Sequence, residues 1–501
     1  MEFILIILSS LLFAIPHYFP ALFFLSWFAF IPLIYLIKDY DYSHSFIIAL
    51  LIGFLSSAFS FYWIYQPLSK TLKMPFSFNI FILFIYFLYS ALPLGFWVII
   101  NKFLQPKYSY SPFIAAISWS VLEYFRFEYL NFNPFNYFAY TQSSFAIIAQ
   151  YASYGGIFLV SFISVLIASY LLKIYLDPNF KKVVPLLIIF IILVIFPSVF
   201  QTDHEANIHN QSLDLLINNS QKNNNMFQKI EAEINDFVTL IDHKQSKYIF
   251  TAEDSFSFDL IKNSFYREKL FSKLENKLNE SYLQLGSNVA AAESYNSEIV
   301  NSLFLLSGEL EIINRSNKQR NFISGINFIY KDDLIYFFSD YLNFNQNNIK
   351  NNNNSETIKV EELRFINLVS EEIFIPLISK NNHSVADLNL IVNSAAESAM
   401  NSKVYSNLAL AAAVFRAAET KTALVRVVNG GYSAYINYQG KIISKEKLKN
   451  DIKTYDLSLY EGQSYYHKYP MRIINIILFV FVVIIFVKII FVLRKKLSSR
   501  D

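Results

Sequence analysis

The chain has 501 residues, of which 54% are hydrophobic and 18% aromatic, and its 42 basic and 39 acidic residues give a formal net charge of +3. This composition is too apolar for a single soluble globule and indicates a membrane protein. The small net charge argues against a nucleic-acid partner, which would need a clustered basic face. The chain contains no cysteine, which excludes disulfides, thiolate metal sites and a thiol nucleophile. Its histidines lack a ligand spacing such as HExxH, so the sequence predicts no metal site and no cofactor.

Apolar stretches dominate the beginning and the end of the chain. Each is near the roughly 20 residues that cross about 30 Å of hydrocarbon. An even number of crossings puts both chain ends on the same side of the membrane. The basic tail "RKKLSSR" indicates that this side is the cytoplasm, so the polar region in between is expected outside the cytoplasm. The stretches run over residues 3–16, 20–37, 45–63, 78–100, 112–125, 145–172, 183–200 and 473–493.

The polar middle region has the pattern of an α/β domain. Short apolar runs bounded by turn residues predict buried strands, and helical patterns lie between them. We therefore expect a transmembrane domain of about seven spans at 1–200, an α/β domain at 201–470, and a final transmembrane helix with a basic tail at 471–501. The asparagine-rich tract 345–354 is expected to be a solvated loop. Strands are predicted at 213–217, 247–253, 302–307, 388–392 and 422–428, and helices at 264–285 and 407–421.

Two segments of the apolar part carry a family resemblance. The stretch "EYFRFEYLNFNPFNYFAY" (123–140) is similar to a Glu-Trp-x-Arg motif followed by Gly-Phe-Pro-Trp-Asn-x-x-Gly-Tyr. The stretch "QYASYGGIFLVSF" (150–162) resembles a Gln and paired-Gly segment. In both, the chain resembles the apolipoprotein N-acyltransferases, which are bacterial inner-membrane enzymes. The matching positions in the first stretch are Glu123, Arg126, Pro134, Asn136 and Tyr140.

This resemblance implies a fold, a location and a reaction. The expected fold is a polytopic α-helical membrane domain plus a periplasmic nitrilase-like α/β domain, a four-layer αββα sandwich. The chain would be a multi-pass protein of the bacterial inner membrane with a cytoplasmic C-terminus. The family takes an acyl chain from a phospholipid onto a cysteine and passes it to the α-amine of a diacylglyceryl-lipoprotein. The implied partners are therefore a phospholipid acyl donor and a diacylglyceryl-lipoprotein acceptor.

The glutamate and the lysine of the family's site have counterparts here. "YIFTAED" (248–254) resembles the family's strand ending in Trp-Pro-Glu, which places Glu253 at the general-base position. "YKDDLIYFF" (330–338) is similar to Tyr-x-Lys-x-x-Leu-Val-Pro-Phe, which places Lys331 at the position that stabilises negative charge on the carbonyl oxygen. For each of these residues the plainer alternative is a solvated surface charge.

The nucleophilic cysteine has no counterpart. "LVSEEIF" (368–374) is similar to the family's Ile-Cys-Tyr-Glu-x-x-Phe when Glu371 and Phe374 are matched. Val369 then stands at the nucleophile position and Glu371 at that of a supporting carboxylate. Valine has no lone pair and cannot form an acyl-enzyme. Ser370 is expected to be a poor substitute, because adjacent side chains on a tight turn point apart and a serine needs stronger activation than a thiol.

Two functions follow from this pattern. One is a divergent N-acyltransferase that works through Ser370 or by direct transfer of the acyl chain with Glu253 and Lys331. The other is a catalytically inactive homologue that binds lipoprotein, phospholipid or a partner enzyme. A carbon–nitrogen hydrolase is disfavoured because it too needs the missing cysteine. The remaining matched positions are expected to support the fold rather than the chemistry: Asn393, Ala395, Arg416, Glu419, Arg426, Asn429, Gly431, Ser433 and Ala434.

Overall fold

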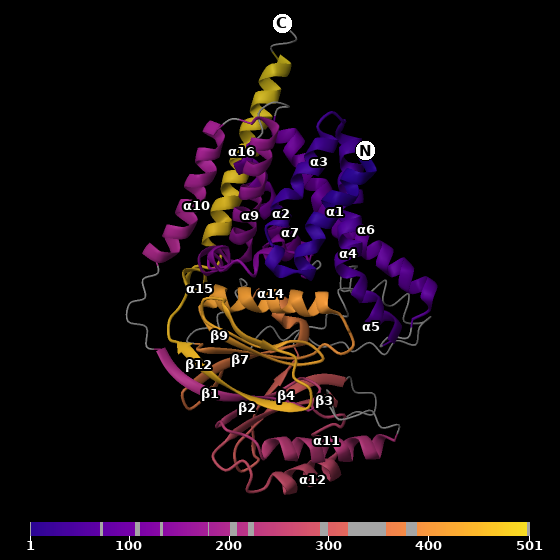
Figure 1. Cartoon of the computed structure of the whole chain (residues 1–501), viewed down its shortest axis with the longest axis vertical. Helices are drawn as coiled ribbons and strands as arrows, with labels where there is room; N and C mark the ends of the chain where they lie inside the picture. The colour runs from indigo at the N-terminus through magenta and orange to yellow at the C-terminus, as the bar shows by residue number, and fades with distance from the viewer. Residues whose placement is uncertain are drawn as a thin grey trace. The chain divides into compact units, whose positions relative to one another are not determined.

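The chain divides into two compact units, each described here by itself (Figure 1). The helical unit comprises residues 1–69, 73–203 and 464–501, and the sandwich unit comprises residues 70–72 and 204–463. The computed structural model describes residues 2–70, 74–105, 111–130, 134–178, 180–200, 208–218, 225–290, 299–318, 357–376 and 388–497.

The helical unit contains helices from both ends of the chain, and the final helix α16 packs against α7 and α9. The α-helices are α1 (Glu2–Tyr18), α2 (Leu25–Phe28), α3 (Phe30–Ile37), α4 (Tyr42–Phe61), α5 (Tyr65–Lys70), α6 (Phe76–Leu104), α7 (Pro112–Leu130), α8 (Ala146–Ala149), α9 (Ala152–Leu176), α10 (Phe180–Phe200), α15 (Tyr465–Lys468) and α16 (Arg472–Leu497). Short 3₁₀ turns are η1 (Pro20–Leu22), η2 (Tyr62–Ile64) and η3 (Phe138–Gln142).

The apolar helices confirm the expected polytopic character of this unit. In the described part of the chain, 5 helical stretches are long and apolar enough to cross a membrane. They are Pro20–Ile37, Tyr42–Lys70, Phe76–Leu104, Ala152–Leu176 and Arg472–Lys495. Shorter apolar helices lie at Glu2–Tyr18 and Val183–Phe196.

Close backbone approach and satisfied polar groups hold these helices together. A Cβ placed on Gly53 of α4 would lie 2.9 Å from the Cα of Ala91 in α6, so the two helices pack closely through small residues, as helices in membranes commonly do. The buried Trp97 indole donates to the carbonyl of Ala115 at 2.9 Å, which joins α6 to α7. Apolar packing alone does not fix helix register, and such buried hydrogen bonds supply the missing specificity.

The sandwich unit contains two six-stranded sheets. The first has the order β12-β1-β2-β3-β4-β5 and the second the order β11-β10-β9-β8-β7-β6. Strands β1 to β3 are parallel to one another, as are β7 to β9. The strands are β1 (Ile208–Ile217), β2 (Tyr248–Thr251), β3 (Tyr282–Ala290), β4 (Ile299–Leu306), β5 (Ile312–Asn317), β6 (Ile358–Val360), β7 (Leu363–Val369), β8 (Leu390–Ala396), β9 (Ala423–Asn429), β10 (Ser433–Ile436), β11 (Ile442–Glu446) and β12 (Asp451–Tyr460).

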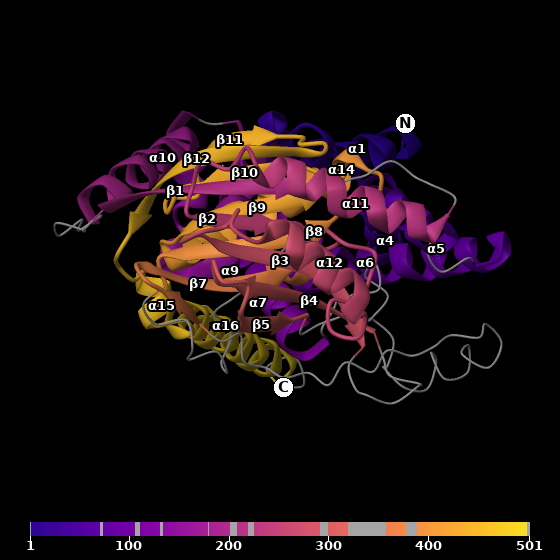
Figure 2. The same ribbon diagram turned by 90° about the horizontal axis from the view of Figure 1, so that it is seen from below.

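Two apolar cores separate the layers of this unit. One core draws on strands of both sheets and fills the space between them, with Phe250 of β2 and Phe365 of β7 in edge-to-face contact at 5.4 Å. The other packs helices α11 (Met226–Ile241) and α12 (Ser264–Leu274) on the outer face of the first sheet, as Figure 2 shows from below. Because both faces of the central strands are covered, strands such as β2 are buried at every position.

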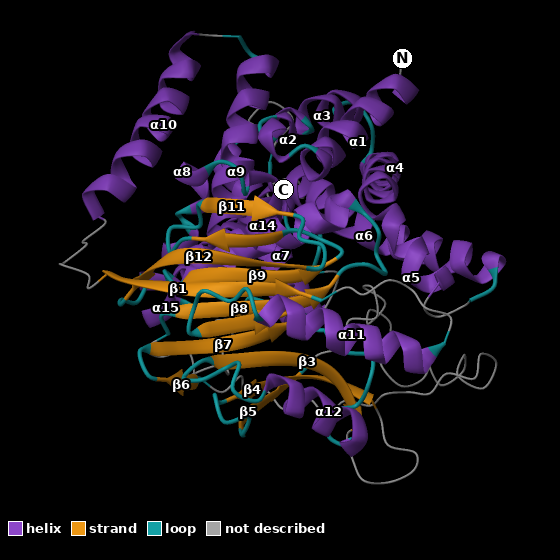
Figure 3. Ribbon diagram, turned by 60° about the horizontal axis from the view of Figure 1, so that its bottom comes forward, coloured by secondary structure: helices purple, strands orange, loops and turns teal. Residues whose placement is uncertain are grey.

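Helix α14 (Lys403–Thr420) covers the second sheet by contacts with β9 and β10 (Figure 3). The Ser402 side chain caps its first turn by accepting from the Tyr405 N–H. Together the helices and sheets form the expected αββα sandwich. The predicted helix over 264–285 is too long, however: α12 ends at Leu274, and β3 begins at Tyr282. Asn276 and Asn279 between them adopt positive φ angles of 63° and 48°, which a helix cannot continue through.

Candidate functional site

The candidate site of the sandwich unit lies where its strands end. Glu253 follows β2, Lys318 follows β5, and Glu371 lies in the 3₁₀ turn η4 (Ser370–Phe374) directly after β7. The carboxyl ends of parallel strands are the usual position of ligand and catalytic sites in α/β folds, because the strand ends project side chains into one shared crevice. The fold therefore brings together three residues that are far apart in the sequence.

These three side chains form a buried ionic cluster. The Lys318 Nζ lies 3.5 Å from Glu253 Oε1 and 3.0 Å from Glu371 Oε2. The side chains of Lys318, Glu253 and Glu371 are only 9%, 3% and 7% exposed. Burial by itself lowers the pKa of Lys318, but the two carboxylates raise it above its ordinary value. The lysine is therefore a fixed positive charge at neutral pH and cannot act there as a base.

Glu253 is held in place by hydrogen bonds from two strands, β8 and β4. Its Oε2 accepts from the Ala396 N–H at the end of β8 at 3.2 Å. Its Oε1 accepts from the side-chain amide of Asn301 in β4, and the carbonyl of Asn301 in turn accepts from the Lys318 N–H at 2.8 Å. Asn301 thus fixes the carboxylate and the backbone of the lysine at the same time, which sets the spacing between these two charged groups.

A second, half-buried acid, Asp254, follows Glu253. The Asn429 side-chain amide donates to both oxygens of Asp254, at 3.1 and 3.2 Å. Burial raises the pKa of Asp254 to about 6, and the negative charge of Glu253 adds to this increase. Asp254 therefore changes its charge near pH 6, which makes the charge of this edge of the sandwich sensitive to pH.

The chain makes a strained turn between β7 and η4. Val369 ends the strand with a 1% exposed side chain, and its N–H donates to Glu372 Oε2 at 2.8 Å. The next residue, Ser370, has a φ of 56°. Positive φ is uncommon for residues other than glycine, and such strained positions cluster at active sites. The turn therefore singles out Ser370 as the residue whose conformation departs from the strand, and Ser370 directly precedes Glu371 of the ionic cluster.

The sequence-based choice of lysine cannot be compared with these positions. Lys331 and the asparagine-rich tract 345–354 lie outside the described residues. The cation that the structure places beside Glu253 is Lys318, which the sequence analysis did not single out. The signal that would have found it is its place directly after a strand, a place that Glu253 shares at the end of β2. That strand, β5, was not predicted, because "IINRSN" (312–317) has few apolar residues to mark it.

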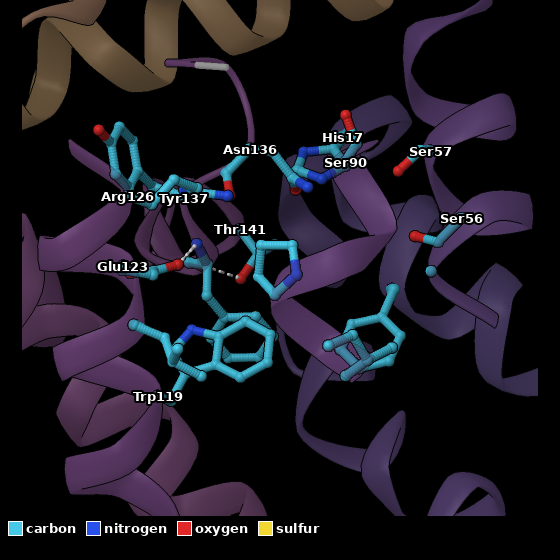
Figure 4. Close-up of a pocket in the computed structure, with 16 residues that line it drawn as sticks. His17, Ser56, Ser57, Ser90, Trp119, Glu123, Arg126, Asn136, Tyr137 and Thr141 are labelled. Atoms are coloured by element: carbon cyan, nitrogen blue, oxygen red, sulfur yellow. Dashed lines mark hydrogen bonds between the residues drawn. The ribbon is translucent and has the colours of Figure 1, made fainter. Parts of the chain in front are cut away.

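The helical unit holds a second polar site, which includes residues of the segment 123–140 (Figure 4). The 1% exposed Glu123 accepts from the Phe138 N–H at 2.7 Å. The Arg126 Nη2 donates to the Asn136 carbonyl at 2.8 Å, and its guanidinium lies 4.9 Å from the centre of the Tyr137 ring. These bonds tie the segment before and within η3 to α7. Further polar residues that line the same cavity are His17, Ser56, Ser57, Ser90 and Thr141.

The described residues hold no group of three or more His, Cys, Asp or Glu side chains arranged to bind a metal ion. Residues 9–170 match the family model of the apolipoprotein N-acyltransferase N-terminal domain. The match covers 162 of the 501 residues and agrees with the resemblance found in the sequence. The matched residues include both segments, 123–140 and 150–162, whereas the Glu253–Lys318–Glu371 cluster lies outside the match.

Comparison with solved structures finds chains of the nitrilase superfamily at low identity. The Caenorhabditis elegans NitFhit protein is 12% identical with a TM-score of 0.37, and the alignment covers 54% of this chain and 64% of the nematode chain. A CN-hydrolase superfamily protein from Xanthomonas campestris is 12% identical with a TM-score of 0.36, covering 52% of this chain and 96% of the other. A branch 10 nitrilase superfamily member from Saccharomyces cerevisiae is 12% identical with a TM-score of 0.34, covering 53% and 96%. No curated protein matches the chain in sequence.

Proposed function

We propose that this protein is an N-acyltransferase that uses a serine in place of a cysteine. It would move an acyl chain from a phospholipid to the N-terminal amine of a diacylglyceryl-lipoprotein. The family match of residues 9–170 supports the substrate class. The observation that carries the proposal is the buried Lys318, which pairs with Glu253 and Glu371 directly beside the positive-φ turn at Ser370.

Each residue of this cluster takes a role that its chemistry allows. Ser370 is the nucleophile, since it is the strained residue of the turn and carries a hydroxyl, whereas Val369 has no nucleophilic atom. Glu253 is the general base, because it is a buried carboxylate fixed by two neutral donors. Lys318 stabilises the negative charge that develops on the carbonyl oxygen. This assignment moves the nucleophile one residue later than the position predicted from the sequence.

The reaction balances with these groups alone. The Ser370 Oγ attacks the phospholipid ester carbon and its proton passes to Glu253. The ester C–O bond then breaks, and the departing glycerol oxygen takes that proton, which leaves a serine acyl ester and a lysophospholipid. The lipoprotein amine attacks the serine ester and gives a proton to Glu253. Cleavage of the ester returns this proton to Oγ and releases the N-acylated lipoprotein.

A serine is a weaker nucleophile than a cysteine, and the site must compensate for this lower reactivity. A thiol is a few per cent thiolate near neutral pH, whereas a hydroxyl carries almost no alkoxide and depends wholly on its base. The double pairing of Lys318 supplies a permanent positive charge, which favours the developing oxyanion in a water-poor setting. We therefore expect slower acylation than a thiol would give at the same place, with the rate strongly dependent on Glu253.

A second candidate is a catalytically inactive homologue that binds lipoprotein, phospholipid or a partner enzyme. One observation favours it: both oxygens of Glu253 already accept from Asn301 or Ala396, and Oε1 also faces Lys318. A base whose lone pairs are occupied takes up a proton less readily.

Under either function we propose a multi-pass protein of the bacterial inner membrane, with residues 201–470 on the periplasmic side and the C-terminus in the cytoplasm.

The absence of cysteine permits a sharp test of the nucleophile position. Ser370→Cys and Val369→Cys each introduce the only thiol of the chain. The purified full-length variants and the natural protein are incubated with phospholipid that carries a labelled acyl chain. We expect Ser370→Cys to form a hydroxylamine-sensitive thioester and Val369→Cys to form none. A thioester on Val369→Cys alone would show that the sequence-based position is correct.

Activity is then measured as transfer to a diacylglyceryl peptide. The natural protein should acylate the peptide, and Ser370→Ala and Glu253→Gln should abolish the transfer. Val369→Ala is the matched control, because it changes the neighbouring buried residue and leaves the hydroxyl in place. If the natural protein is inert while Ser370→Cys gains transfer, the inactive homologue is the correct function. Activity that survives Ser370→Ala but not Glu253→Gln would indicate direct transfer without an acyl-enzyme.

A further inference from the structure

The turn at Ser370 is held by a residue of the neighbouring strand. The Asn393 side-chain amide donates to the carbonyl of Leu368 at 2.9 Å and to that of Ser370 at 3.2 Å. These two carbonyls flank Val369, so a single amide group fixes the orientation of the peptide planes on both sides of the turn. Asn393 is buried and pairs in register with Leu368 across β7 and β8.

A buried arginine holds Asn393 in turn. The Arg426 Nε donates to Asn393 Oδ1 at 2.9 Å, and its Nη2 donates to Glu397 Oε1 at 2.6 Å. Arg426 is the register partner of Asn393 across β8 and β9. Leu368, Asn393 and Arg426 therefore form one row across three parallel strands. The arginine accounts for the orientation of the asparagine amide, because the oxygen must face the guanidinium and the nitrogen must then face the turn.

The far end of this row is also fixed. Glu397 Oε2 accepts from the Ser406 hydroxyl of α14 at 2.6 Å, so the carboxylate cannot swing away from Arg426. A Cβ on Gly431 would overlap this carboxylate, and glycine there leaves the room that Glu397 occupies. Ser406, Glu397, Arg426 and Asn393 therefore form a buried hydrogen-bond network from α14 to the turn. Each side chain in this network has a single orientation.

We infer that Arg426 and Asn393 are positioning residues, which hold Ser370 in its left-handed conformation for the acyl transfer. The inference rests on the proposed function for its catalytic meaning. A positive φ is unfavourable at a serine and persists only when the surroundings determine it. The two hydrogen bonds from Asn393 are such a determinant. Arg426, which the sequence analysis assigned to the fold alone, acts on the site through that amide.

The structure supplies matched controls for both residues. Asn389 is another buried asparagine beside β7: its amide donates to the Glu362 carbonyl at 2.8 Å and its oxygen accepts from the Arg364 N–H at 2.9 Å. It bridges the opposite end of the strand from Ser370. Arg416 is another fully buried arginine, paired with Glu419 within α14 at 3.0 Å. Neither control bonds to the turn in the part of the chain that the structure describes.

The test compares Asn393→Ala and Arg426→Lys with Asn389→Ala and Arg416→Lys in the full-length protein. Thermal stability, kcat and KM for peptide acylation are measured for each. We expect the first pair to lower kcat about tenfold or more, equivalent to ~1.4 kcal/mol in the barrier, with KM unchanged. The controls should keep kcat within about threefold at a comparable loss of thermal stability. A fall in kcat that merely follows thermal stability in all four variants would overturn the inference.

A second readout keeps the inference testable if the natural protein proves inert. In the Ser370→Cys background, the alkylation rate of the single thiol by iodoacetamide reports the conformation of the turn without any acyl transfer. Adding Asn393→Ala should change this rate at least about threefold, and adding Asn389→Ala should not. Equal rates in both double variants would show that Asn393 does not position residue 370. Unequal rates in an inert protein would refute the proposed function and leave the positioning role intact.

Discussion

Replacement of Lys318 by methionine tests the central claim about the site, namely that this lysine compensates the buried acids. Methionine keeps much of the length and apolar stem of lysine and removes the charge. In the natural protein the ammonium lies 3.5 Å from Glu253 Oε1 and 3.0 Å from Glu371 Oε2. The Lys318→Met variant therefore leaves two buried carboxylates next to each other without a cation.

The expected cost follows from the burial of these groups. Removing one partner of a buried ion pair typically destabilises a protein by about 3–5 kcal/mol, because the remaining charge is left uncompensated. At roughly 2–4 °C per kcal/mol for a domain of this size, the melting temperature should fall by about 10 °C. Acyl transfer should be lost as well, because the oxyanion loses its positive charge. Lys331→Met is measured beside it, because the sequence predicts Lys331 at the oxyanion position, and a loss of transfer in this variant alone would support that prediction.

The pH dependence of this loss provides an independent check. The pKa of Lys318 is raised above its ordinary value, so its stabilising contribution is present throughout the range below the ordinary lysine pKa of about 10.4 and is lost only as pH rises through the folded value. In Lys318→Met, the repulsion between the two uncompensated carboxylates weakens when protons are more abundant. The difference in melting temperature between variant and natural protein should therefore be smaller at pH 5 than at pH 8. A loss that is equal at both values, or a larger loss for Lys331→Met, would refute the reasoning.

Three further changes test other parts of the fold by thermal unfolding of the full-length protein in detergent. Asp254→Asn should stabilise the protein above pH 6, by up to about 3 kcal/mol. The pKa of Asp254 is raised to about 6, so the acid destabilises the fold increasingly as pH rises from about 4 to 6; an unchanged pH profile would contradict this. Glu123→Ala should cost about 1–3 kcal/mol because it leaves the buried Phe138 N–H without an acceptor, and Glu123→Gln, which keeps an acceptor, should cost less. Gly156→Ala should be strongly destabilising, since φ is 66° there and the new Cβ would lie 2.6 Å from the Tyr466 ring. Adding Tyr466→Ala should restore part of the lost stability, because it removes the clash with the ring. If it restores none, the loss arises from the backbone conformation alone.

Local pattern accounts for much of the architecture. The apolar stretches predicted a polytopic helical domain, because a span must be apolar over its full length whatever its neighbours are. Strands such as β1, β2 and β9 were also predicted, since strands buried on both faces form short continuous apolar runs. The helix expected over 264–285 was predicted too long because the prediction followed apolar spacing alone. Its apolar spacing continues past Leu274, but Asn276 and Asn279 leave the helical conformation, and a periodicity count does not register that.

The sequence identified some residues of the candidate site and missed others. Glu253 and Glu371 could be named in advance because each follows an apolar strand or lies in a recognisable motif. Lys318 could not, because it follows a polar strand, and only the pairing of β5 with β4 carries it to Glu253. The choice between Val369 and Ser370 depends on one φ angle, and that angle depends on Asn393 and Arg426 from neighbouring strands.

The amino-acid sequence by itself determined the membrane character, the α/β pattern of the middle region and the absence of any thiol chemistry, because these depend on composition and on short-range periodicity. The αββα layering was implied by the family resemblance. The tertiary structure decided which charges meet, which residue occupies the turn after β7, and what holds it there. Those features arise from hydrogen bonds and ion pairs between residues separated by about 25 to 140 positions in the chain. Such contacts exist only after the strands have paired, so no local pattern encodes them.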